Sequence, residues 1–129
     1  MLPDFLLKET TIRESGESAL FEIARHECGQ LLLTFGITHA VENQSVNLEV
    51  HTSQDGQTWA LRPFAAFPAK CYCGEYQMAL PLRDARFLKV KWRVSRWSRS
   101  GERPFFRFYV FADLVRSRTP AAYMTAGAA

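Results

Sequence analysis

Apolar and polar residues alternate with a period of two along most of this chain. The pattern is typical of β-strands that bury one face, because successive side chains on a strand point to opposite sides of the sheet. At 86–95, for example, Leu88 and Val90 share one side while Lys89 and Lys91 share the other. Segments with this pattern, or with a short apolar run, lie at 5–13, 18–25, 30–38, 45–53, 57–64, 75–80, 86–95 and 104–112.

These segments recur at even spacing, with Gly, Pro, Asn and Asp between them. About eight short strands in this arrangement predict an all-β fold, an antiparallel β-sandwich of the jelly-roll kind. The segment at 104–112 is apolar on both sides, which predicts a central strand covered on both faces. No window favours an amphipathic helix, apart from one helical turn near 62–70.

The length of 129 residues and the hydrophobic content of 47% predict one domain with one core. We expect residues 1–118 to form that domain and the small-residue-rich segment 119–129 to be a flexible tail. No apolar run approaches the roughly 18 residues of a membrane span, and no basic segment followed by an apolar one marks a secretory signal. The expectation is therefore a cytoplasmic protein without a membrane partner.

The three cysteines are Cys28, Cys71 and Cys73, and an odd number favours a reducing compartment over a disulfide framework. Together with His26 they would make a chemically legitimate zinc set. However, the strand order places His26 and Cys28 at one end of the predicted sandwich and the other two cysteines at the opposite end. We therefore expect no metal and no cofactor.

Charge is distributed unevenly: residues 1–82 hold five basic and ten acidic residues, and residues 83–129 hold eleven basic and three acidic ones. One interpretation is a surface for an anionic polymer over 83–107, with Lys89, Lys91 and Arg93 as a basic stripe joined by Arg107 from a neighbouring strand. The other is that the two halves interleave and their charges meet. Nucleic acid is disfavoured, because the apolar residues within the stripe face the core and leave nothing for bases to stack on.

The segment Ser53-Gln54-Asp55-Gly56-Gln57-Thr58-Trp59 joins two predicted strands. Asp-Gly suits a tight hairpin, after which Trp59 would return to the core, and the alternative is a loop that binds a ligand or calcium. The run LEVHTSQDGQTW, followed later by Ala85-Arg86-Phe87-Leu88-Lys89-Val90-Lys91, resembles the discoidin or coagulation-factor C-type family of galactose-binding-like domains. The resemblance covers about residues 29–112. It implies an eight-stranded jelly roll that binds sugars, lipids or proteins without catalysis, through loops at one end.

Successive loops of a sandwich alternate between its two ends, because each strand reverses direction. This parity predicts that loops 39–44, 65–74 and 96–103 share one end with the turn at 14–17, and that loops 26–29, 54–56 and 81–85 share the other. The first end carries the candidate ligand-binding residues His39, Asn43, Tyr72, Arg96, Trp97 and Arg99. An exposed Trp beside Arg suits a sugar or an anion, whereas a Trp tucked under its own loop would make the arginines merely solvated.

The sequence holds no phosphate-binding glycine loop, nucleophile elbow or zinc-protease motif, so we expect no enzyme. The leading hypothesis is a non-enzymatic module that binds a carbohydrate or another polar ligand at this end of the sandwich. The alternatives are an assembly protein that forms oligomers through its doubly apolar segments, and a binder of an anionic polymer.

Overall fold

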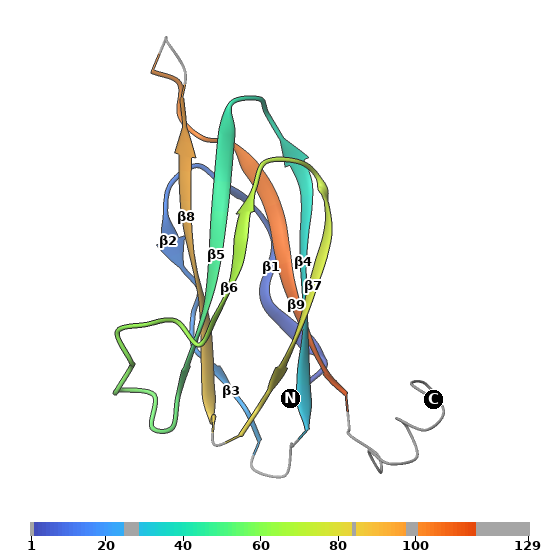
Figure 1. Ribbon diagram of the computed structural model, residues 1–129, viewed down its shortest axis with the longest axis vertical. Coiled ribbons are helices and arrows are strands. Elements are labelled where there is room, and N and C mark those ends of the chain that lie inside the picture. Colours follow the sequence, from blue (N-terminus) through green and yellow to red (C-terminus); the bar gives the residue numbers. More distant parts are fainter. Residues whose placement is uncertain (1, 25–28, 84, 98–100, 116–129) are drawn as a thin grey trace.

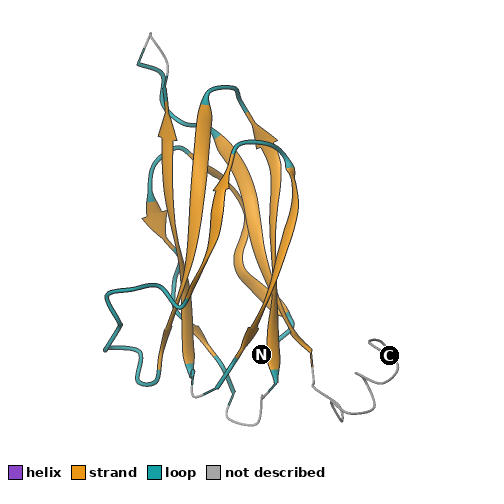
Figure 2. Cartoon of the chain, in the orientation of Figure 1, coloured by secondary structure: helices purple, strands orange, loops and turns teal. Residues whose placement is uncertain are grey.

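The computed structural model describes residues 2–24, 29–83, 85–97 and 101–115. These residues form an all-β sandwich, as the alternation predicts (Figures 1 and 2). The strands are β1 (Asp4–Ile12), β2 (Gly16–Glu17), β3 (Phe21–Glu22), β4 (Gln30–Ala40), β5 (Gln44–Ser53), β6 (Ala65–Lys70), β7 (Gly74–Pro81), β8 (Phe87–Arg96) and β9 (Phe106–Val115). Over the described ranges there is no helix long and apolar enough to cross a membrane.

The strands form two antiparallel sheets that we call sheet A, in the order β1-β9-β4-β7, and sheet B, in the order β2-β8-β5-β6 with β3 also on β8. The pairing is nested: β1 pairs with β9, β2 and β3 with β8, β4 with β7, and β5 with β6. A chain folded back on itself and rolled up in this way is a jelly roll. Its strands number eight when β2 and β3 are taken as one interrupted strand, which confirms the predicted fold class.

The core lies between the sheets and is rich in aromatic rings. Phe35 of β4 packs edge-on against Phe108 of β9 at 5.1 Å between ring centroids and against Phe67 of β6 at 5.5 Å. Trp92 of β8 contacts Phe108 from the other sheet at 5.9 Å. Because the Phe35–Phe67 and Trp92–Phe108 contacts cross between the sheets, burial of the alternating residues stabilises both sheets together.

The strand predicted at 57–64 is wrong, and so is the helical turn near 62–70. Residues 54–64 are a long loop, and the strand β6 begins at Ala65. Oδ1 of Asp55 accepts hydrogen bonds from the backbone N–H groups of Gln57 and Thr58, both at 2.8 Å, and these bonds stop the chain from returning at once into a strand. Trp59 therefore does not reach the core but lies under the Lys89 ammonium, 4.4 Å from it, on the outer face of sheet B.

Two further expectations need correction. Within the segment predicted as one strand at 18–25, the described residues form only the short strand β3 (Phe21–Glu22), and the other short strand, β2 (Gly16–Glu17), lies just before it. The segment at 104–112 does supply a central strand, β9, but only its inner face is fully covered. On its outer face Arg107 is exposed, and Tyr109 and Phe111 are half-buried. The predicted tail at 119–129 lies outside the described residues.

Candidate functional site

The turns after β4, β6 and β8 emerge at one end of the sandwich, and the loops after β5 and β7 emerge at the other (Figure 1). The chain from β1 to β2 also turns at the first end, which we call the loop end. The predicted grouping of the loops is thus confirmed for these connections. One detail differs, because most of the predicted loop 65–74 is the strand β6 and only residues 71–73 form the turn.

Trp97 follows β8 directly, and its side chain is exposed at the loop end. Its backbone N–H donates a 2.9 Å hydrogen bond to the carbonyl of Asn43, in the turn between β4 and β5. Asn43 adopts a positive φ of 61°, a conformation that Asn tolerates better than most residues. With 58% of its surface exposed, Trp97 is not tucked under its own loop.

Arg96 is not a free cation, because its side chain is packed into the base of the same loop and is only 14% exposed. Its guanidinium lies 3.6 Å from the Glu102 carboxylate and donates to the carbonyl of Arg103 at 3.2 Å. Its Nε atom is buried, and no hydrogen-bond partner for it is found in the part of the chain that the structure describes. Arg96 therefore braces the β8–β9 connection.

Phe105 closes this connection from below. The buried side chain of Gln44 donates to the Phe105 carbonyl at 2.7 Å and accepts from the Phe105 N–H at 2.8 Å. The ring of Phe105 contacts the His39 ring at 5.1 Å and the Arg13 guanidinium at 5.0 Å. Three loop-end connections, β1–β2, β4–β5 and β8–β9, are therefore held in a fixed relation to one another.

The structure thus links four of the predicted site residues: Asn43 and Trp97 directly, Arg96 as the neighbour of Trp97, and His39 through Phe105. Tyr72 is 80% exposed in the separate turn between β6 and β7, where its carbonyl accepts a 2.9 Å bond from the Tyr76 hydroxyl. Arg99 lies outside the described residues.

Sequence reasoning missed a second feature, a cleft of about 410 Å³ on the outer face of sheet A. Its lining comes from all four strands: Phe5, Glu9, Thr34, Glu75, Gln77, Tyr109 and Phe111. These residues were not singled out because their proximity depends on how four strands are aligned. The one sequence signal was Gly36, because a glycine inside a strand often marks a close approach.

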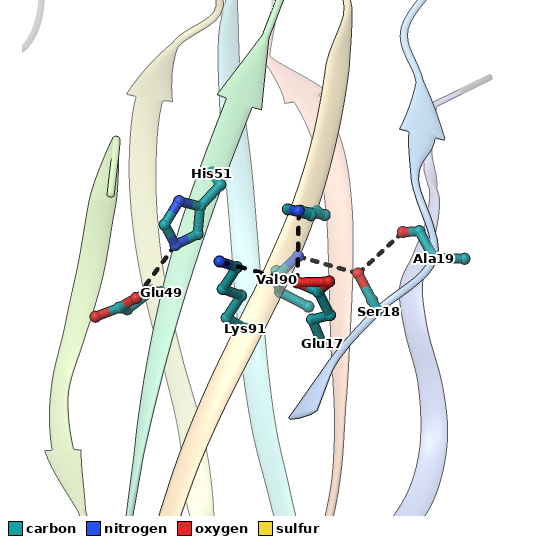
Figure 3. Close-up of polar contacts among 8 residues, drawn as sticks. Glu17, Ser18, Ala19, Glu49, His51, Val90 and Lys91 are labelled. Carbon is teal, nitrogen blue, oxygen red and sulfur yellow. Dashed lines mark hydrogen bonds and ion pairs between the residues drawn. The ribbon is translucent and has the colours of Figure 1, made fainter. Parts of the chain in front are cut away.

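The outer face of sheet B carries the predicted basic residues Lys89, Lys91 and Arg93, and one carboxylate pairs with the two lysines. Lys89 and Lys91 lie 3.4 and 3.9 Å from the Glu17 carboxylate on β2 (Figure 3). Figure 3 also shows Glu49 directed toward His51, at 3.1 Å.

Arg107 does not join this stripe. It lies on β9 in sheet A and pairs with Glu9 at 2.7 Å. Together with the Lys89–Glu17 pair and the Arg103–Glu14 pair at 3.7 Å, it shows that acidic groups of the first half meet basic groups of the second. The interleaving interpretation of the uneven charge is therefore the one that the structure supports.

The Asp-Gly loop is held by its own hydrogen bonds at the end opposite the loop end. The backbone N–H groups of Thr58 and Gln57 and the Ser53 hydroxyl donate to Asp55 and hold the pKa of its carboxyl far below the ordinary value. Oδ2 of Asp55 also accepts from the Thr58 hydroxyl at 3.1 Å. Because these bonds occupy the carboxylate, it has a structural role in the loop.

Cys71 and Cys73 are free thiols in the turn between β6 and β7, and the structure brings no group of three or more metal-ligating side chains together among the residues that it describes. His26 and Cys28 of the zinc set lie outside those residues.

No protein-family model matches the chain. No curated protein matches it either. The resemblance to discoidin-like domains therefore stays a prediction from two short motifs.

Proposed function

We propose that this protein is a non-enzymatic binding module that recognises a carbohydrate or a similar polar ligand at its loop end. The observation that carries the proposal is Trp97: a large flat ring that is 58% exposed yet follows a strand whose end is fixed. An aromatic ring carried on a fixed backbone provides a stacking surface at low cost in conformational entropy, because only the side-chain torsions remain to be ordered. The neighbouring Asn43, His39 and Arg103 supply polar groups for orienting a ligand.

The rigid surroundings of Trp97 support the proposal further. Arg96, Gln44 and Phe105 join the loop to the sandwich through buried or half-buried contacts, so that a ligand need not order the base of the site. Pre-organisation of this kind increases affinity because less freedom is lost on binding.

An array of neutral, amino and acidic glycans tests the proposal, followed by titration calorimetry with wild type and Trp97→Ala. We expect at least one glycan class to bind, and the variant to lose about tenfold in affinity, as the loss of one stacked ring implies. Leu61→Ala is the matched control, because Leu61 is fully exposed in the β5–β6 loop at the opposite end. Absence of any glycan binding would contradict the proposal, and so would equal affinity of wild type and Trp97→Ala.

An assembly protein is the second candidate, and the half-buried rings on the outer face of sheet A favour it. Phe5 is 40% exposed there and contacts Phe111 edge-on at 5.0 Å. Sedimentation at micromolar concentration tests this function: a concentration-dependent dimer supports it, and a strict monomer excludes it.

A further inference from the structure

We propose that the cleft on the outer face of sheet A is a second binding site, a platform for one pyranose ring of a neutral oligosaccharide. The cleft is on a sheet face and not at the loop end, so the two sites are separate. The proposal shares with the proposed function only the ligand class, and the experiment below tells the two apart.

The floor of this cleft is the ring of Tyr109. Its Cζ, Cε2 and Oη atoms all lie where a side chain at Gly36 would begin. The ring of Tyr109 therefore extends from β9 over the backbone of the neighbouring strand β4 and does not point away from the sheet. The pairing of Gly36 with both Tyr109 and Glu75 places these three residues in one row across β9, β4 and β7. The Tyr109 hydroxyl donates to Glu75 at 2.7 Å and fixes the far end of the ring.

A wall and a polar rim surround this floor. Phe5 contacts Tyr109 at 6.0 Å and Phe111 at 5.0 Å between ring centroids, both edge-on, so that it closes the cleft on the side of β1. On the next row, Gln77 donates to the Thr34 hydroxyl at 3.2 Å. Amide, hydroxyl and carboxylate groups thus lie around an aromatic floor.

Two of the residues that line the cleft are carboxylates, and each uses only one of its two oxygens in the hydrogen bonds found. Glu9 uses Oε2 to accept from Arg107 at 2.7 Å and from Thr38 at 2.9 Å, and Glu75 uses Oε2 to accept from Tyr109. Across the described ranges, no hydrogen bond is found to Oε1 of either residue. These two oxygens suit sugar hydroxyls, because hydrogen bonds to a charged acceptor are stronger than neutral ones.

The arrangement fits a pyranose better than other occupants. A pyranose has one apolar C–H face for stacking and a rim of hydroxyls for polar groups, and the cleft offers both. A cationic ligand would have only the Glu75 carboxylate to pair with, because Arg107 already pairs with Glu9. A second copy of the chain would need about 800 Å² on each partner, whereas this face is crossed by charged and polar side chains.

The test is an ¹H–¹⁵N NMR titration with cellotetraose, mannotetraose and xylotetraose, using wild type, Tyr109→Ala, Gly36→Ala and Trp97→Ala. We expect shifts at Gly36, Gln77 and Tyr109 and about a tenfold loss of affinity in Tyr109→Ala and Gly36→Ala. Gly36→Ala is the sharper variant, because its methyl group displaces the ring of Tyr109 without removing any side chain that lines the cleft. Gly16→Ala is the matched control, a glycine substitution in sheet B, and should bind as wild type.

The outcomes separate the two sites. Loss in Gly36→Ala with normal binding in Trp97→Ala at these residues supports the platform. Loss in Trp97→Ala alone overturns the platform and leaves the proposed function standing. No shift anywhere with all three neutral sugars also overturns the platform, whereas the proposed function is decided by the wider glycan array. Tighter binding of a chitosan tetramer than of the neutral sugars would overturn the proposal in favour of a cationic ligand. A dimer that Gly36→Ala dissociates would overturn it in favour of a second copy of the chain.

Discussion

The outer faces of the two sheets differ in how their side chains lie. On sheet A, Tyr109 lies across the backbone at Gly36, and the rings of Phe5 and Phe111 border a cleft. On sheet B, long charged side chains cover the surface: Lys89 and Lys91 converge on Glu17, and Lys89 also covers the ring of Trp59. The outer face of sheet A leaves aromatic surface and hydrogen-bond acceptors available, whereas on sheet B the two lysines contact Glu17 and Trp59 of the same face.

The composition of a strand alone does not decide what its exposed surface does. β8 carries more cations than β9, yet Glu17 from the short strand β2 pairs with two of them and offsets one of their two charges. β9 carries aromatic residues, and one absent side chain on the neighbouring strand turns Tyr109 into a floor. The alignment of neighbouring strands decides both outcomes.

The largest expected effect comes from a substitution in the core, which lies beneath the outer faces of both sheets. Phe108→Ala deletes a fully buried ring that contacts Phe35 and Trp92, and we expect the free energy of unfolding to fall by about 3–5 kcal/mol. Urea denaturation followed by tryptophan fluorescence and by circular dichroism should show one transition. Phe5→Ala on the surface is the control and should cost clearly less. Separate transitions for the two probes would mean that the faces do not share one core.

Glu17→Gln should increase the difference in charge between the outer faces of the two sheets. Without this carboxylate, Lys89 and Lys91 lose a shared partner, and sheet B becomes a basic surface. We expect later elution from a heparin column, with a steeper salt dependence, while the free energy of unfolding changes by less than about 1 kcal/mol. Glu9→Gln, which frees only Arg107, should shift elution less. Equal elution of Glu17→Gln and wild type would show that the pairs do not mask the lysines.

Alkaline titration probes sheet A alone. The hydrogen bond to Glu75 raises the pKa of Tyr109 above its ordinary value, followed by burial and by the nearby carboxylate charges. A raised pKa means that this contribution to stability is present below about pH 10 and is lost as the pH rises through the folded-state pKa. ¹³C NMR of the tyrosine rings should show Tyr109 titrating late, and Glu75→Gln should bring it back toward the ordinary value. A Tyr109 that titrates normally in wild type would argue against the fixed ring.

The smallest effect concerns the rim of the cleft. Hydrogen bonds from Arg107 and then from Thr38 lower the pKa of Glu9. A lowered carboxyl pKa contributes stability above about pH 4, which is lost as the pH falls through the folded-state value. Arg107→Gln should raise the pKa of Glu9 toward normal in a ¹³C carboxyl titration, and Thr38→Val should raise it less. The reverse order of the two variants would contradict the assigned causes.

The alternation of residues was enough to predict the sandwich, and strand parity was enough to predict the loop end. Both follow from local rules, because side-chain direction and chain reversal depend only on neighbours in sequence. The proximity of Tyr109, Gly36 and Glu75 could not be predicted from the sequence, because it depends on the alignment of three strands that are distant in the chain. The loop at 54–64 was misplaced for a different reason: the hydrogen bonds of Asp55 prolong a turn that apolar residues alone would end early.

The partnership of β1 with β9 has a consequence for how the protein is made. The first and last strands of the described chain meet only after everything between them has been synthesised, and pairings so distant in sequence form slowly. A nascent chain that ends before β9 lacks the floor of the sheet A cleft, and a chain whose N-terminal strand has come loose lacks its wall. Any recognition on this face would thus report that both ends of the polypeptide have docked.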